Sequence, residues 1–187
     1  MLVTLAGISF FTWVLPTCHI GSGYVAKVVG SVVFTAGRPV DTARMQEVKF
    51  LDFVSVDVNS ESKTVTASVC GIGRQTAKFR EGLGVSLSHD EPFIDIGPRP
   101  LTKDINNSEE HVWPREYQTE VPGEAYDRSQ LDTVLEQAFT ESNRQHPVFT
   151  RAVVVIHHGQ LIAERYADGF DENSRLAGWS MTKSLVN

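Results

Sequence analysis

The order of elements in the last third of the chain limits the folds that it can form. After Asp127 and Ser129, either of which can cap a helix, apolar residues recur at helical spacing: Leu131, Val134, Leu135, Ala138 and Phe139. A strand-length apolar run, 151–157, comes next, and a His-Gly turn at 158–159 leads into a second run, 160–166. A helix followed by a hairpin predicts an α/β fold in which the helix packs on an antiparallel sheet.

The region 28–89 is expected to form a small β-rich module. Val32–Phe34 is a short apolar run closed by a turn cluster at 36–39. Two longer β-branched runs, 48–58 and 64–70, are joined by five polar residues. Such runs predict strands, and the short polar connection predicts a hairpin between them.

Two segments of unusual composition flank this module. No Asp, Glu, Lys or Arg precedes Lys27, and residues 1–16 are mostly apolar. A run of this length suits the core of a signal peptide better than a membrane span of about 20 residues. We therefore expect 1–27 to be an apolar signal or membrane-associated segment, with a buried helix or strand as the alternative. Residues 90–122 carry five prolines and predict a connector with little regular structure.

Composition excludes several classes of protein. Of the 187 residues, 41% are hydrophobic and 21% charged, which is typical of a globular chain. The net charge is −6 with no long block of either sign, so no nucleic-acid partner is expected. The two cysteines, Cys18 and Cys70, are too few for a disulfide framework and match no zinc spacing. Whether they pair, and whether the chain forms oligomers, is not indicated.

The pattern Ser180-x-x-Lys183 is the candidate catalytic site. If a helix begins near Ser180, residues three apart share one face, with Cβ atoms about 5–6 Å apart. A serine hydroxyl needs a base within hydrogen-bond reach, and a lysine is a base only when neutral, a form that burial favours. The backbone N–H of Ser180 at a helix start would stabilise an oxyanion. Ser180 is thus a candidate nucleophile and Lys183 its candidate base.

Spacing alone does not identify this pair, because Ser60 and Lys63 have the same spacing. That second pair lies in a polar turn, where the lysine is expected to stay solvated and charged, and it is given no role. Ser180 instead follows an apolar helix and hairpin and lies between Trp179 and Met181. The alternative reading is that Ser180 only caps a helix, with Lys183 solvated in its first turn.

Residues 151–187 resemble the superfamily of serine β-lactamases, penicillin-binding proteins and related esterases. The resemblance rests on the strand ending at His157, the return strand ending at Tyr166, and the segment GWSMTKS at 178–184. This segment is similar to that of bacterial serine hydrolases grouped with 6-aminohexanoate-dimer hydrolase and class C β-lactamases. Through the segments 31–38 and 82–84, the β-rich module is similar to the amino-terminal extension of such proteins.

The resemblance implies a hydrolase of amide or ester bonds that works through an acyl-enzyme on Ser180, with Lys183 as base and without metal or cofactor. It implies a small-molecule amide or ester as substrate and a place in the bacterial cell envelope. The family's second and third elements, Tyr-x-Asn or Ser-x-Asn and Lys-Thr-Gly or His-x-Gly, cannot be placed before Asn187. We therefore expect 123–187 to be the beginning of a β-lactamase-like domain, in an amino-terminal fragment that is inactive alone.

Two other functions stay open. A non-catalytic penicillin-binding or sensor module would keep the fold and the serine without turnover. Alternatively, the chain is a β-rich export-associated domain in which the Ser-x-x-Lys match arises by chance.

Three further features are given no catalytic role. His157 and His158 are expected to point to opposite faces of a strand and so not to share a metal ion. Trp179 is expected to pack at the helix start rather than to line a substrate pocket. Four glycines lack the strand–loop–helix context of a phosphate-binding loop and are expected at turns or bulges: Gly71, Gly73, Gly82 and Gly84.

Overall fold

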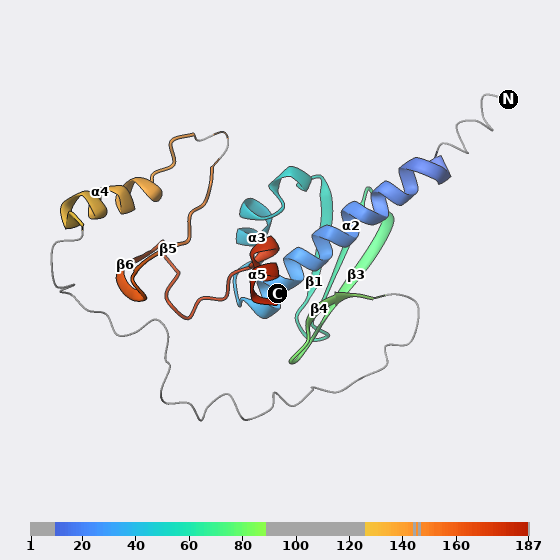
Figure 1. Cartoon of the computed structure of the whole chain (residues 1–187). Coiled ribbons are helices and arrows are strands. Elements are labelled where there is room, and N and C mark those ends of the chain that lie inside the picture. The colour runs from blue at the N-terminus through green and yellow to red at the C-terminus, as the bar shows by residue number, and fades with distance from the viewer. Residues whose placement is uncertain (1–9, 89–125, 144, 146, 187) are drawn as a thin grey trace. The chain divides into compact units, whose positions relative to one another are not determined.

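The structure is a computed structural model, which describes residues 10–88, 126–143, 145 and 147–186 (Figure 1). A long helix packs on a four-stranded antiparallel sheet, and a two-stranded hairpin follows later in the chain, so the fold is of the expected mixed α/β class. The helix that packs on the larger sheet comes from the beginning of the chain and is not the helix predicted around Leu131. Contacts divide the chain into two compact units, residues 1–100 with 175–187, and residues 101–174. Each unit has buried apolar residues of its own.

The sheet of the first unit is a meander of four strands in chain order. β1 (Val54–Asn59) and β2 (Thr64–Val69) form the hairpin that the two β-branched runs predict. β3 (Ile72–Arg80) and β4 (Gly84–Leu87) continue the antiparallel pairing. Between β2 and β3, Cys70 and Gly71 have φ angles of 49° and 78°, both left-handed, as a type I′ turn requires.

The sheet packs against α2 (Leu15–Gly30), which π-helical turns continue at both ends, Phe10–Val14 and Ser31–Thr35 (Figure 1). Pro16 stands in the first turn of α2, directly after the π-helical turn Phe10–Val14. The buried residues of α2 recur at helical intervals and form one face: Ser22, Gly23, Val25, Ala26, Val29 and Gly30. This face packs mainly on β2 and β3.

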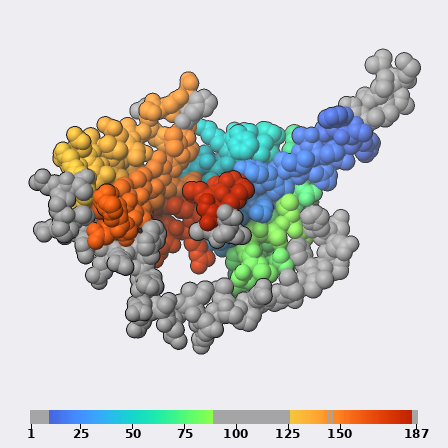
Figure 2. Space-filling view, viewed as in Figure 1, coloured from blue at the N-terminus to red at the C-terminus, as the bar shows by residue number. Residues whose placement is uncertain are grey.

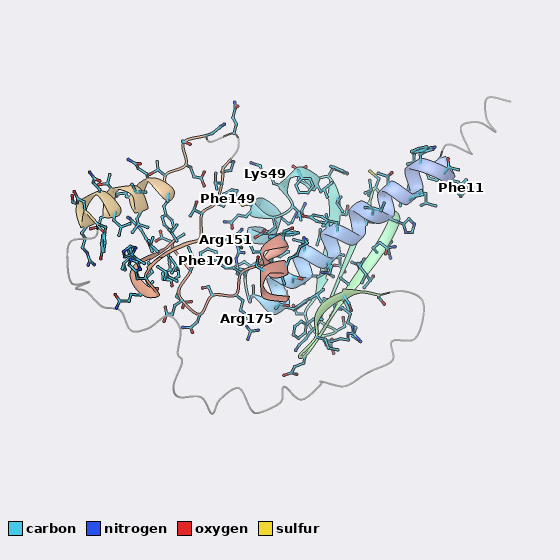
Figure 3. All side chains as sticks on the ribbon, in the orientation of Figure 1. Phe11, Lys49, Phe149, Arg151, Phe170 and Arg175 are labelled. Atoms are coloured by element: carbon cyan, nitrogen blue, oxygen red, sulfur yellow. The ribbon has the colours of Figure 1, made fainter. Side chains whose placement is uncertain are left out.

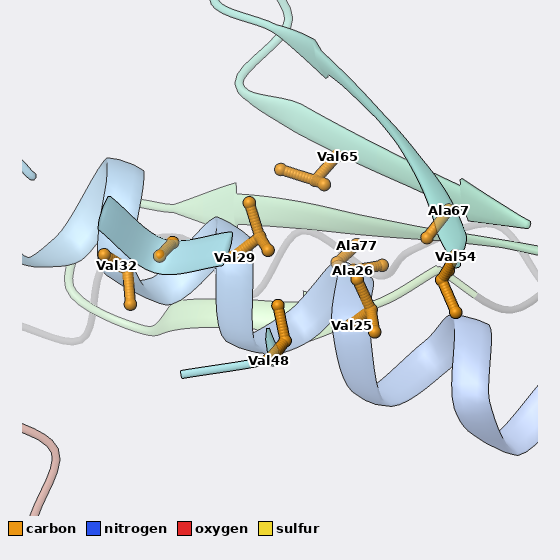
Figure 4. Packing of buried hydrophobic residues seen from close by; sticks show 10 residues of the cluster. Val25, Ala26, Val29, Val32, Val48, Val54, Val65, Ala67 and Ala77 are labelled. Carbon is orange, nitrogen blue, oxygen red and sulfur yellow. The ribbon is translucent and has the colours of Figure 1, made fainter. Parts of the chain in front are cut away.

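Small residues let the backbone of α2 approach the sheet closely. Gly73 lies in a bulge of β3, where it and Arg74 stand opposite the single residue Ser68 of β2. A β-carbon on Gly73 would lie 2.7 Å from the backbone carbonyl carbon of Cys18, so a side chain does not fit there. Valine and alanine fill the space between the two layers (Figure 4), chiefly Val25, Ala26, Val29, Val54, Val65, Ala67 and Ala77.

The prediction of strands at the beginning of the module 28–89 is wrong. Residues 28–35 are helical, and α3 (Val40–Gln46) and a 3₁₀ turn (Lys49–Leu51) precede β1. Val29 and Val32 are strand-type residues, but both are buried on the helix side of the core. Burial against the sheet therefore overrides their modest preference for strands. The expected boundary between residues 27 and 28 falls inside a helix.

The amino-terminal end of the long helix extends past the sheet (Figure 3, where Phe11 is labelled). Phe11 and Trp13 have exposed fractions of 68% and 74%, whereas Ser22 to Ala26 lie in or beside the core. Among the helices of the described residues, none has both the length and the apolar character needed to cross a bilayer. Part of the expected apolar segment 1–27 is thus a helix packed on a sheet, and residues 1–9 lie outside the described part.

The second unit contains the helix and the hairpin that the sequence predicts. α4 (Arg128–Ala138) follows Asp127, whose carboxylate accepts hydrogen bonds from the backbone N–H groups of Ser129 and Gln130. The Ser129 hydroxyl, and then these N–H groups, lower the pKa of Asp127. β5 (Ala152–His157) and β6 (Gln160–Tyr166) pair antiparallel. The turn between them is the expected His-Gly pair.

Ring contacts join both ends of α4 to this hairpin. The guanidinium of Arg165 lies 5.7 Å from the ring centroid of Phe139, which ends the helix. The rings of Tyr126 and His157 have centroids 6.5 Å apart at the helix start. The expected connector, 90–122, lies outside the described residues.

Candidate active site

Ser180 and Lys183 lie in two short consecutive helical elements. Ser180 is the middle residue of a 3₁₀ turn (Trp179–Met181), and Lys183 is the second residue of α5 (Thr182–Val186). The side-chain nitrogen Nζ of Lys183 donates a hydrogen bond to Oγ of Ser180 at 3.0 Å. The structure therefore places the predicted nucleophile and the predicted base in direct contact.

The backbone before Ser180 is tightly constrained. Trp179 has a φ of 45°, a left-handed conformation that costs a non-glycine residue on the order of 1–3 kcal/mol. The N–H of Met181 donates to the carbonyl of Gly178 at 2.9 Å and closes the turn. A β-carbon on Gly178 would lie 2.7 Å from the hydroxyl oxygen of Thr182, so a larger residue would require the Thr182 side chain to rotate. Strained backbone of this kind is concentrated at functional sites.

The pair lies at the surface of the first unit, in the segment drawn red in Figure 2. Ser180 and Lys183 are exposed, and Trp179 and Met181 have exposed fractions of 60% and 72%. A lysine accepts a proton only in its neutral form, which burial in an apolar site favours. The described residues do not provide that burial. The contact between the two groups is present, while the buried environment remains a prediction.

Trp179 makes a ring contact with the long helix but stays largely exposed, so it does not pack into the core as expected. Its ring stacks on that of Tyr24 of α2, with centroids 6.5 Å apart and an angle of 26° between the planes. Burial first, and then the negative charge of Glu47, raise the pKa of Tyr24. In the same segment, the guanidinium of Arg175 donates to the backbone carbonyl of Thr35 at 3.4 Å.

The other Ser-x-x-Lys pair has a different geometry. Lys63 directs its ammonium over the ring of Phe79, 5.2 Å from the centroid. Within the described part of the chain, no hydrogen bond joins Lys63 to Ser60. The structure thus distinguishes two pairs of identical spacing, because only Lys183 is directed at its serine.

The two histidines do not point to opposite faces of a strand, contrary to the prediction. His157 and His158 have ring centroids 4.1 Å apart, so their rings do not point to opposite faces. The cause is the φ of 49° at His158, which belongs to the turn rather than to β5. Even so, the described residues contain no group of three or more His, Cys, Asp or Glu side chains able to hold a metal ion. The glycines at 71, 73, 82 and 84 all have positive φ and lie at turns or at the bulge of β3.

A groove of about 840 Å³ between α2, β3 and β4 was not predicted from the sequence. Polar side chains from both layers line it, among them His19, Tyr24 and Arg74. Nδ1 of His19 lies 2.8 Å from Nε2 of Gln75, a residue 56 positions later in the chain. No local pattern predicts a contact at that separation, since it depends on how the helix docks on the sheet.

Comparisons with protein-family models, with curated proteins and with solved structures found no match to this chain.

Proposed function

We propose that this chain carries the nucleophile segment of a serine hydrolase that cleaves amide or ester bonds through an acyl-enzyme. The observation that supports it is the 3.0 Å hydrogen bond from Lys183 to Ser180. Such a distance is within the range over which a general base takes a proton from a nucleophile. Oγ of Ser180 would attack the substrate carbonyl while Nζ of Lys183 takes the hydroxyl proton. The protonated lysine would then donate to the leaving group, and water would release the acyl group.

The order of elements supports a β-lactamase-like version of this chemistry. Helix α4 is followed by the β5–β6 hairpin and then by the turn that carries the serine. The hairpin and the turn that carries the serine are the features on which the resemblance to β-lactamases and penicillin-binding proteins rests. The left-handed backbone of Trp179 directly precedes Ser180 and would fix the direction in which the serine is presented.

Catalysis at Ser180 also needs groups that exclude water from Lys183 and complete the oxyanion site. In the family that the chain resembles, these come from a Tyr-x-Asn or Ser-x-Asn element and from a Lys-Thr-Gly-like strand. Reading the gene beyond the codon for Asn187 is therefore an immediate check. A Tyr-x-Asn element about 60–120 residues on supports the assignment, and its absence favours a chance match.

The direct test uses the full-length product of the gene and a fluorophosphonate probe, with the modified peptide located by mass spectrometry. We expect modification at Ser180, its loss in Ser180→Ala, and no change in the matched control Ser60→Ala. Labelling that persists in Ser180→Ala would remove Ser180 from the mechanism. A stable acyl adduct that water does not release would instead indicate a penicillin-binding or sensor module.

We also propose that the exposed amino-terminal end of the long helix binds a membrane surface, in keeping with a place in the cell envelope. Phe11 and Trp13 are exposed there, and no Asp, Glu, Lys or Arg precedes Lys27. Inserting such an end into the interface of a bilayer would bury aromatic side chains without dehydrating a charged one.

A further inference from the structure

Three aromatic rings connect the Ser180 turn to the layer of helix and sheet in the first unit. Trp179 stacks on Tyr24, with ring centroids 6.5 Å apart, and Tyr24 meets Phe50 at 5.9 Å. Tyr24 belongs to α2 and Phe50 to the 3₁₀ turn before β1. We propose that Tyr24 and Phe50 are positioning residues, which act through Trp179 to fix the direction in which Ser180 faces its substrate. This inference rests on the proposed function for its catalytic consequence.

Trp179 controls the direction in which Ser180 and Lys183 point, and not the contact between their side chains. Ser180 and Lys183 both follow Trp179, so their 3.0 Å contact is set by the short helical elements that they share. Rotation about the φ bond of Trp179 would turn both residues together relative to the chain that precedes them. Because a φ of 45° is unfavourable for tryptophan, this direction persists only if other contacts hold the ring.

Tyr24 is well placed to hold that ring. Its neighbours Gly23 and Val25 are buried in the face of α2 that packs on the sheet, so the backbone under Tyr24 is fixed. Trp179 is 60% exposed, and its ring stacks on that of Tyr24. The hydrogen bond from Arg175 to the carbonyl of Thr35 attaches the same segment at a second point.

The amino-terminal module therefore contributes to the catalytic site through its surface rather than by a reacting group. Removing the ring of Tyr24 frees Trp179 to leave the left-handed conformation, which lowers the fraction of molecules that present Ser180 correctly. The energy of an aromatic pair corresponds to a loss of roughly 3- to 10-fold in that fraction. We expect this loss in the acylation rate at saturating probe, with little change in the concentration of probe at half saturation.

The test compares Tyr24→Leu with Tyr24→Phe, which keeps the ring, and with Phe34→Leu as a matched control. Phe34 pairs with Phe79 at 6.3 Å in the same unit and does not contact Trp179 in any ring pair of the described residues. The full-length protein is labelled with 5-fluorotryptophan, and the ¹⁹F resonance of Trp179 is identified by its loss in Trp179→Phe. Acylation of Ser180 by the fluorophosphonate is timed on the same samples.

We expect Tyr24→Leu to shift the Trp179 resonance and to slow acylation, and Tyr24→Phe to restore both. Phe34→Leu should lower the melting temperature and leave the Trp179 resonance in place. An unchanged resonance in Tyr24→Leu would show that the rings do not stack in solution and would overturn the inference. A shifted resonance with an unchanged acylation rate would also overturn it, since Trp179 would then not direct Ser180. If the parent protein is not acylated at all, the proposed function fails, and the resonance still decides whether the stack exists.

Discussion

Gly73→Ala should destabilise the first unit far more than an ordinary glycine substitution in a hairpin. Gly73 has a φ of 61° in the bulge of β3, and a β-carbon there would lie 2.7 Å from both the carbonyl carbon and the Cβ of Cys18. The obstacle is backbone of α2, which cannot move aside as a flexible side chain would. Alanine therefore requires the helix to lift from the sheet or the bulge to change.

The loss of folding free energy in Gly73→Ala has two parts. A left-handed alanine costs about 1–2 kcal/mol, and forcing a methyl group into a filled contact costs about 1–3 kcal/mol more. The expected total of about 2–5 kcal/mol is a large part of the 5–15 kcal/mol by which domains are usually stable. Gly71→Ala separates the two parts, because Gly71 has a φ of 78° in the adjacent turn and open space where its β-carbon would be. Gly71→Ala should lose only about 1–2 kcal/mol of folding free energy, which is the cost of a left-handed alanine.

Urea unfolding followed by circular dichroism measures both variants, and amide hydrogen exchange of residues 64–80 assigns the loss to the sheet. We expect Gly73→Ala to have the lower midpoint and the faster exchange in β2 and β3. Equal losses for the two alanine variants would refute the reasoning, since they would mean that α2 does not press on β3 at this glycine.

Two further predictions concern the start of α4 and the amino-terminal end of the long helix. The pKa of Asp127 is lowered, so its cap stabilises α4 above the ordinary carboxyl pKa of 3.8 and is lost as the pH falls through the lower folded value. An acid titration by circular dichroism should thus show a loss of helix that is absent in Asp127→Ala; identical titrations would exclude the cap. For the membrane proposal, Trp13→Ser should weaken sedimentation with phosphatidylglycerol-containing vesicles, and Phe53→Ser, which is exposed outside α2, should not. Equal binding by both variants would argue against a membrane role for this helix end.

Elements with local signals were predicted correctly. The polar loop 60–63 fixes the β1–β2 hairpin, the His-Gly turn fixes the β5–β6 hairpin, and Asp127 begins α4. Each signal lies within a few residues of the structure that it specifies, so the surrounding fold does not need to be known. The contact between Ser180 and Lys183 belongs to the same class, because a separation of three residues in a helical turn brings the side chains together.

Features that depend on distant contacts were missed. The valine-rich sequence from Val28 to Phe34 has the composition of a strand, and only the docking of α2 on the sheet makes it helical. One signal was present: Ser22, Ala26, Val29 and Gly30 recur at helical spacing and lie on the buried face. The environment of Lys183 could not be predicted, since burial depends on whatever packs over α5. The stack of Trp179 on Tyr24 joins residues from opposite ends of the sequence, which no local pattern specifies.

The role of the lysine is the centre of the proposed chemistry, and the rate of acylation at Ser180 measures it most directly. In the full-length protein, Lys183→Met should slow fluorophosphonate modification of Ser180 by about 10²- to 10⁴-fold, the usual contribution of a general base. Lys63→Met, which alters the other Ser-x-x-Lys pair, should leave the rate as it is. If both methionine variants react as fast as the parent, Lys183 does not activate Ser180, and the hydrogen bond between them is only a surface contact.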